Sequence, residues 1–177
     1  MHGVRVIGRA FTSPALHPSL MRTYQFIALT LLRAVAALVM MQHGAQKLFG
    51  VLGGMGPHHG TVALFSLMGL AGVLETFVAF LVLVGLFARP AAFLLSGEMA
   101  VAYFMAHAPR AFWPIQNHGE VPVLLSFIWL FIAAVGAGPY SLDALLLRRR
   151  ALAGAPAPSP GDRSTRATHS LGHTHAR

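Results

Sequence analysis

The feature that most constrains this chain is a series of four apolar runs, each interrupted by one charged residue at most. They extend over about 24–41, 61–87, 90–106 and 121–137. A helix needs about 20 apolar residues to cross the hydrocarbon core of a bilayer, so each run is long enough to cross it or nearly so. The sequence therefore predicts an all-α integral membrane protein, an antiparallel bundle of four helices.

The composition excludes most other classes of protein. Charged residues make up 10% of the chain and hydrophobic residues 55%, whereas a soluble domain carries about 25% charged residues. Cysteine is absent, which excludes a disulfide, a thiolate metal site and a thiol relay. The basic residues stand at the edges of the apolar runs rather than in one stripe. We therefore expect the lipid bilayer, and no nucleic acid, as a partner.

Turn-forming residues divide the sequence into three parts. Residues 1–22 are expected to form a flexible basic extension, within which Met21 offers an alternative start. Residues 23–147 form the membrane domain. Residues 148–177 are rich in Pro, Ala, Ser and Arg and are expected to be a disordered basic tail. Within the membrane domain, the predicted helices cover about 24–48, 61–87, 90–107 and 120–137.

The arginines are distributed unequally between the two ends of the predicted helices. If four helices cross, one side holds Arg5, Arg9, Arg22, Arg89, Arg148, Arg149 and Arg150. The opposite side holds only Lys47 and Arg110. Because Lys and Arg near helix ends stay in the cytoplasm, this bias predicts that both termini are cytoplasmic.

Three ionisable residues inside the runs form a predicted inner layer. At about 1.5 Å per residue, Arg33, Glu75 and Glu98 lie roughly 13, 18 and 12 Å from the cytoplasmic ends of their helices. A charge in hydrocarbon needs a partner, and the planar guanidinium of Arg33 can bridge two carboxylates. We expect Arg33 to contact Glu75, Glu98 or both. The cluster is either a structural clamp or, because carboxylates are in excess, a proton-handling site or polar ligand pocket.

A second group of polar residues is expected at the outer ends of the helices. His43 and Lys47 are four residues apart on one face of the first helix, and Glu120 opens the fourth. We expect these three to share hydrogen bonds. The predicted outer layer consists of His43, Gln46, Lys47, His107, Asn117, His118 and Glu120. It serves either in capping or as a site for the polar head of a quinone or another small ligand. No pair has dedicated ligand spacing, so neither a metal nor a haem site is predicted.

Six short motifs occur in a fixed order along the membrane domain. They are Leu31-Leu32-Arg33, 43–50 (HGAQKLFG), 72–75 (GVLE), 85–92 (GLFARPAA), 117–120 (NHGE) and 136–143 (GAGPYSLD). Together they resemble the DoxX family of small bacterial membrane proteins over about 31–145. The family usually has glycine where this chain has His118, so a strict glycine requirement there does not carry over.

The resemblance implies a four-helix protein of the bacterial inner membrane. Members of the family are commonly labelled oxidoreductases, and relatives include a subunit of an archaeal thiosulfate:quinone oxidoreductase and a mycobacterial member associated with thiol-oxidant detoxification. It implies a redox-linked, quinone-associated membrane subunit that acts with a soluble or membrane partner. The alternative is a non-enzymatic membrane scaffold or small-molecule carrier with structural buried charges. The residues assign no catalytic group to either.

Overall fold

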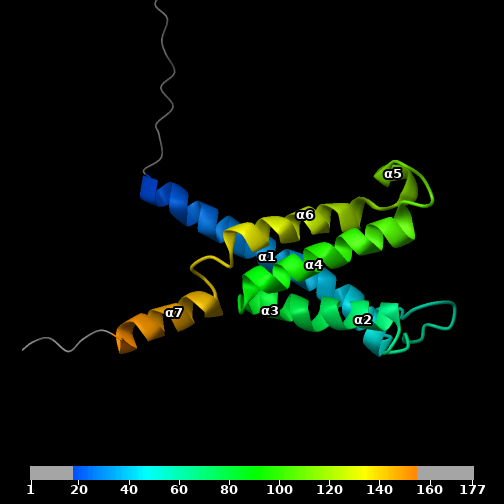
Figure 1. Cartoon of the computed structure of the whole chain (residues 1–177), viewed down its shortest axis with the longest axis horizontal. Coiled ribbons are helices and arrows are strands. Elements are labelled where there is room, and N and C mark those ends of the chain that lie inside the picture. Colours follow the sequence, from blue (N-terminus) through cyan, green and yellow to red (C-terminus); the bar gives the residue numbers. More distant parts are fainter. Residues whose placement is uncertain (1–17, 155–177) are drawn as a thin grey trace, which may run out of the picture. The chain divides into compact units, whose positions relative to one another are not determined.

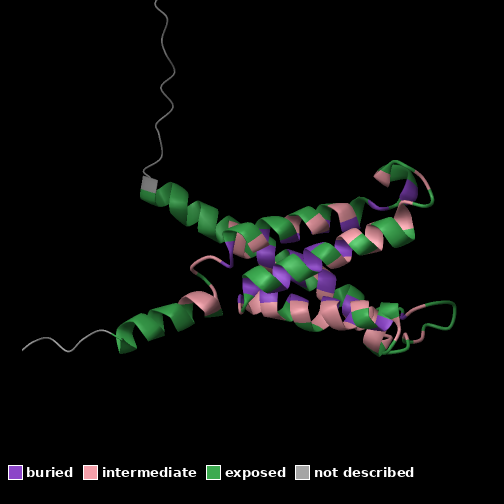
Figure 2. Cartoon of the chain, in the orientation of Figure 1, coloured by how far each residue is buried: buried purple, intermediate pink, exposed green. Residues whose placement is uncertain are grey.

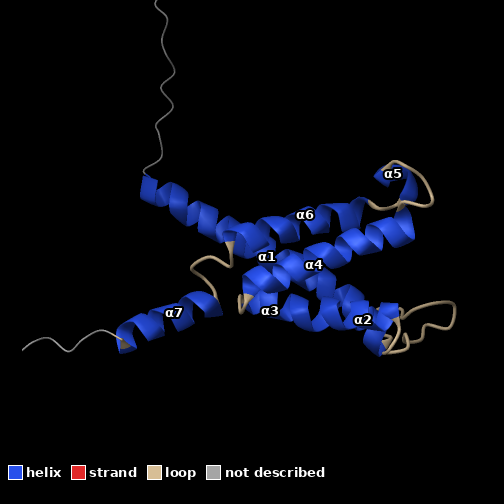
Figure 3. Ribbon diagram, in the orientation of Figure 1, coloured by secondary structure: helices blue, strands red, loops and turns tan. Residues whose placement is uncertain are grey.

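The structure is a computed structural model that describes residues 18–154. Within this range the regular elements are helices (Figure 1, Figure 3). One isolated antiparallel β-bridge joins Met55 to Gly60. The all-α prediction is therefore confirmed for the described part of the chain. The chain divides into two compact units, Met1–Ala144 and Leu145–Arg177, and the first contains the site described below.

Helix α1 spans Pro18–Phe49. It begins earlier than expected because Pro18 is its first residue, a position where the missing N–H of proline leaves no hydrogen bond unmade. Residues 18–22 are thus helical, whereas the rest of the predicted N-terminal extension lies outside the described residues. The helix ends before Gly50, whose φ of +67° turns the chain away.

The second predicted helix is continuous but shorter than expected. It consists of α2 (Leu67–Val73), the π-helical turn η1 (Leu74–Val78) and α3 (Ala79–Val84). Ser66 caps its start by accepting a hydrogen bond from the Gly69 amide at 3.0 Å, so residues 61–66 belong to the preceding loop. Gly85, with φ +71°, ends it.

The remaining helices follow after short connections. A third continuous helix consists of α4 (Ala88–Ala102) and the π-helical turn η2 (Tyr103–His107). The short α5 (Pro114–Asn117) precedes α6 (Glu120–Val135). Helix α7 (Leu142–Ala153) includes Arg148–Arg150, which we had expected in a disordered tail, and the chain from 155 on is outside the described range.

The core of the first unit is built from small and branched side chains on facing helices (Figure 2). Helix α4 packs along α6, and α1 packs against α2, η1 and α3. Ser96 and Ser126 join α4 to α6 through reciprocal bonds, each hydroxyl donating to the other's carbonyl at 2.9 and 3.1 Å. The fully buried residues of the core include Ala37, Ala79, Val82, Ala92, Leu95, Trp129 and Ile132.

Large apolar side chains point outward from the same helices. Leu31, Val35 and Phe127 are 60%, 60% and 67% exposed. In the part of the chain that the structure describes, two helices are long and apolar enough to cross a membrane, Ser19–Phe49 and Leu67–Val84, and Glu120–Val135 is apolar but shorter. Such outward-facing side chains are typical of helices that contact lipid.

Asp143 caps the third helix. Its carboxylate accepts hydrogen bonds from the Phe87 and Ala88 amides at 2.9 and 3.1 Å. The Asp143 amide itself donates to the Gly85 carbonyl at 2.9 Å. The start of α4 is thereby fixed to residues that follow α6 in the sequence.

We expect Asp143→Ala to lower the free energy of unfolding by about 1 kcal/mol, as loss of a helix cap usually does. Asp143→Asn retains one acceptor oxygen and should lose less. Thermal unfolding in detergent would test this, and an unchanged midpoint for Asp143→Ala would contradict the capping role.

Candidate ligand-binding cavity

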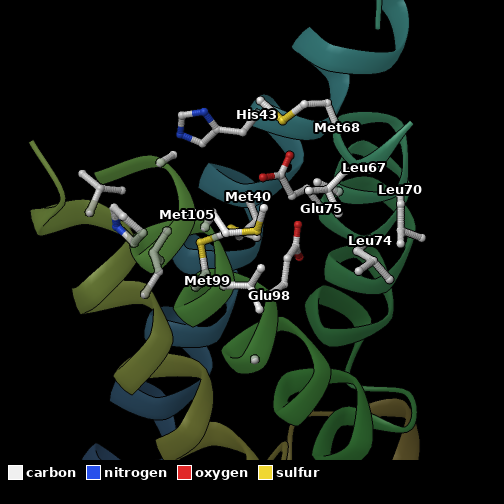
Figure 4. A pocket seen from close by; sticks show the side chains of 18 of the residues that line it. Met40, His43, Leu67, Met68, Leu70, Leu74, Glu75, Glu98, Met99 and Met105 are labelled. Atoms are coloured by element: carbon white, nitrogen blue, oxygen red, sulfur yellow. The ribbon is translucent and has the colours of Figure 1, made fainter. Parts of the chain in front are cut away.

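A cavity of about 820 Å³ lies between α1, α2, η1, α4, η2 and the start of α6. Its volume is within the range of roughly 300–1,000 Å³ that is typical of small-molecule sites. Most of its lining is apolar, and several flexible methionine side chains can adapt to a ligand (Figure 4). The apolar lining includes Met40, Leu67, Met68, Leu70, Leu74, Phe93, Leu94, Met99, Met105 and Leu125.

A buried ion pair lies in the wall of this cavity. The ammonium of Lys47 donates to Glu75 Oε1 at 2.5 Å. The two side chains are only 14% and 4% exposed, so water screens the pair little. Lys47 is also the single lysine in the chain. A cation on α1 thus neutralises a carboxylate on η1.

Three carboxylate oxygens in the cavity have no hydrogen-bond partner among the described residues. They are Glu75 Oε2 and both carboxylate oxygens of Glu98. The carboxyl groups of Glu75 and Glu98 extend into the same space between the helices (Figure 4). Buried acceptors without partners are costly, so each such group calls for an explanation. A ligand that fills the cavity would supply the missing donors.

The position of Glu75 depends on an unusually close helix contact. A Cβ atom at Gly44 would lie 2.7 Å from the Thr76 amide nitrogen and 2.8 Å from the Gly72 carbonyl oxygen. Only glycine therefore lets α1 approach η1 this closely, and Lys47 follows one turn later on α1. Glu75 lies in the π-helical turn of η1, and such turns often mark functional sites.

The predicted inner layer does not form, and the expectation that Arg33 contacts the two glutamates is wrong. Arg33 donates instead to the carbonyls of Val82 and Tyr140, at 3.2 and 2.8 Å. The prediction set Arg33 and Glu75 at similar depths, but Arg33 lies beside Val82, about 10 Å along the second helix from Glu75. Lys47, in the last turn of α1, reaches Glu75, whereas Arg33 lies beside the C-terminal end of α3.

The predicted outer layer is brought together only in part. Four of its members line the cavity: His43, Lys47, His107 and His118. Glu120 is exposed and outside the cavity lining, and the expected contact with Lys47 is replaced by the Lys47–Glu75 pair. Lys47 thus joins the predicted outer layer to Glu75 of the predicted inner layer.

Asn117 and Gln46 organise the loops next to the cavity. Asn117 is fully buried, donates to the Ala111 carbonyl at 2.8 Å and accepts from the Gly119 amide at 2.8 Å. The Asn117 carbonyl also lies 3.0 Å from His107 Nδ1. Gln46 donates to the Leu52 carbonyl at 3.4 Å. These two residues support the site without lining it.

A second polar cluster, which the sequence analysis did not predict, joins the other ends of the helices. We call it the Arg33–Asp143 linkage; it consists of Arg33, Gly85, Arg89 and Asp143. Arg89 donates to the carbonyls of Ala133 at 3.2 Å and Ala134, near the end of α6. A Cβ at Gly85 would overlap the Arg33 guanidinium, so this glycine is required by both its φ and its neighbour. The motifs at 31–33, 85–92 and 136–143 contain these residues, but they give no indication of the contacts.

No group of three or more His, Cys, Asp or Glu residues within 18–154 is arranged to hold a metal ion. The polar lining of the cavity consists instead of one ammonium, two carboxyl groups and three imidazoles. These groups can donate and accept hydrogen bonds and exchange protons with a ligand.

The fold and the cavity together define an all-helical protein with membrane-type helices and an amphipathic cavity between them. Residues 28–108 match the DoxX family model, which confirms the family resemblance over the segment that carries Lys47, Glu75 and Glu98. An uncharacterized protein of Haemophilus influenzae is 48% identical over 63 residues, which are 34% of this chain and 47% of that protein. The chain therefore matches about half the length of this relative. No solved structure matches the chain.

Proposed function

We propose that this protein binds a quinone in the cavity and acts as a redox-linked membrane subunit with a soluble or membrane partner. The observation that carries the proposal is the combination of an apolar cavity of about 820 Å³ with unpartnered carboxylate oxygens and an ammonium at one place in its wall. A quinone and its reduced form share an apolar ring and tail with polar oxygens on the ring; the carbonyl oxygens of the quinone can accept from Lys47, and the hydroxyl groups of the reduced form can donate to the carboxylates. When bound, the quinone would supply the capacity to carry electrons and protons.

The residues of the cavity suit this ligand in different ways. Met68, Phe93 and Met105 offer apolar contacts to a ring and tail. Lys47 can donate to a ligand oxygen, since its Glu75 bond uses one of its three N–H groups. Glu98 can accept a hydrogen bond or hold a proton. These side chains would orient the polar end of the ligand next to η1.

The same proposal includes the membrane topology. We propose that α1, the α2–α3 helix, the α4–η2 helix and α6 all cross the bacterial inner membrane as a four-helix bundle, with both termini in the cytoplasm. Support comes from the Arg22, Arg89 and Arg148–Arg150 positions on one side and only Lys47 and Arg110 on the other.

Reporter fusions would test this topology. A reporter joined after Gly154 should behave as cytoplasmic, and one inserted in the loop at 53–60 should behave as external. The charge bias is the physical reason, so moving arginines across the membrane should weaken the orientation. An external C-terminus would contradict it.

Ligand extraction and binding would test the function. The protein purified in mild detergent should retain quinone above the amount in the accompanying lipid, and in nanodiscs it should bind decylubiquinone saturably. Lys47→Met should weaken this binding several-fold, whereas Glu120→Gln, an exposed carboxylate outside the cavity, should not. No excess quinone together with purely non-saturable partitioning would contradict the proposal.

A small-molecule carrier or scaffold is the second candidate. It is favoured by the acid–base character of every polar side chain that lines the cavity, which suffices to hold and release a ligand without electron transfer. The two candidates differ in one measurement. A redox-linked subunit should change the oxidation state of added decylubiquinone in membranes that contain its partner, whereas a carrier should only bind or move it.

A further inference from the structure

We infer that the cavity binds the hydroquinone form of its ligand more tightly than the quinone form. This inference rests on the proposed function and adds the preferred state of the ligand. It follows from the kind of polar atoms that the cavity leaves without partners (Figure 4).

While Glu75 and Glu98 are ionised, all of the unpartnered carboxylate atoms in the cavity wall are hydrogen-bond acceptors. Glu75 Oε2 and the two oxygens of Glu98 are buried and lack donors among residues 18–154. The side chain of Glu75 is 4% exposed. The hydroxyl groups of a hydroquinone donate hydrogen bonds, whereas the carbonyl groups of a quinone only accept them. A quinone would therefore leave these oxygens unsatisfied, at the cost of buried acceptors without partners.

The net charge of the site also favours a ligand that donates hydrogen bonds. Lys47 keeps two N–H groups besides the one bonded to Glu75 Oε1 at 2.5 Å, and an oxygen of either form of the ligand can accept from them. With Lys47, Glu75 and Glu98 all ionised, one negative charge is in excess. The carbonyl oxygens of a quinone carry partial negative charge and would add to it, whereas the hydroxyl hydrogens of a hydroquinone would offset it.

The preference should depend on pH through the groups that face Glu98 and the ligand. They are Lys47 and His43 from α1, Glu75 from η1, His107 from η2 and His118 from the turn before α6. A proton on Glu98 or on one of these histidines adds a donor that can bond to a quinone carbonyl. The preference for hydroquinone should therefore grow as pH rises and shrink as pH falls.

The test compares three ligands with the same ring and tail in oxygen-free nanodiscs: decylubiquinol, decylubiquinone and the dimethyl ether of decylubiquinol, which has no donor. At about pH 8 we expect decylubiquinol to bind about tenfold more tightly than decylubiquinone, the effect of one hydrogen bond to a charged acceptor. The ether should bind no better than the quinone. In Glu98→Gln the ratio of the affinities for decylubiquinol and decylubiquinone should fall towards one, because an amide both donates and accepts hydrogen bonds. Glu120→Gln should keep the wild-type ratio.

The outcomes separate this inference from the proposed function. Saturable binding of quinol and quinone with equal affinity would overturn the inference and leave the proposed function in place. Failure of all three ligands to saturate would overturn the proposed function. If Glu98→Gln does not fold, as judged by gel filtration, the wild-type protein is used instead. The ratio of its affinities for decylubiquinol and decylubiquinone is then measured between about pH 6 and about pH 8. A ratio that rises with pH supports the inference, and a flat or falling ratio overturns it.

Discussion

Lys47→Met should lower the free energy of unfolding by about 3–5 kcal/mol, the usual cost of removing one partner from a buried ion pair. The physical reason is Glu75, which is 4% exposed and has no other hydrogen-bonded partner in the described part of the chain. Methionine keeps most of the lysine volume, so the loss reports on charge more than on packing. Unfolding by denaturing detergent, followed by circular dichroism, would measure it.

The double variant Lys47→Met, Glu75→Gln separates the ion pair from other effects. It should recover much of the stability, because the neutral amide no longer requires a cation. Arg110→Met is the matched control, since Arg110 is an exposed cation expected on the same side, and should change stability by less than about 0.5 kcal/mol. If the effects of Lys47→Met and Glu75→Gln on the free energy of unfolding were additive, the two residues would not interact, and the ion pair would be contradicted.

Arg33→Met should lower the free energy of unfolding by about 3 kcal/mol. Arg33 is 3% exposed, and its guanidinium holds the carbonyls of Val82 and Tyr140. Methionine would leave both carbonyls without this donor and would loosen the segment that brings Asp143 to the start of α4. The same unfolding measurement applies.

Arg33 should act independently of the glutamates. The effects of Arg33→Met and Glu75→Gln should add to within about 0.5 kcal/mol, as expected for residues without shared contacts. Arg33→Lys keeps the charge but loses the planar fork, and it should recover only part of the stability. Strong coupling between Arg33 and Glu75 would mean that the two residues interact in one cluster, which would contradict the geometry described above.

The helical class and the residues of the site could be predicted from the sequence, because apolar runs and isolated charges within them are rare and specific signals. Glu75 and Glu98 were expected to need a cation, whereas Lys47 was expected to share hydrogen bonds with His43 and Glu120. The choice of partner depended on how far along the second helix each cation of α1 lies. Arg33 lies beside Val82, about two turns from Glu75, and Lys47 is the cation that bonds to Glu75. The apolar runs contain no signal that fixes how two helices are aligned along their length.

The partners of Arg33 could not be predicted for a different reason. Every residue has a backbone carbonyl, so nothing in the sequence distinguishes Val82 and Tyr140 as acceptors. They are available because Gly85 ends one helix and the chain turns between α6 and α7. The close approach of α1 to η1 at Gly44 could not be predicted either, because a glycine in an apolar helix can be present for several other reasons.

Photo-crosslinking with a quinone that carries a diazirine on its tail tests most directly whether the cavity is the ligand site. Mass spectrometry of the labelled protein should find adducts on buried cavity residues such as Met40 and Met99, and excess decylubiquinone should abolish them. Adducts spread over outward-facing residues such as Phe127 and Phe131, with no competition by decylubiquinone, would contradict the account.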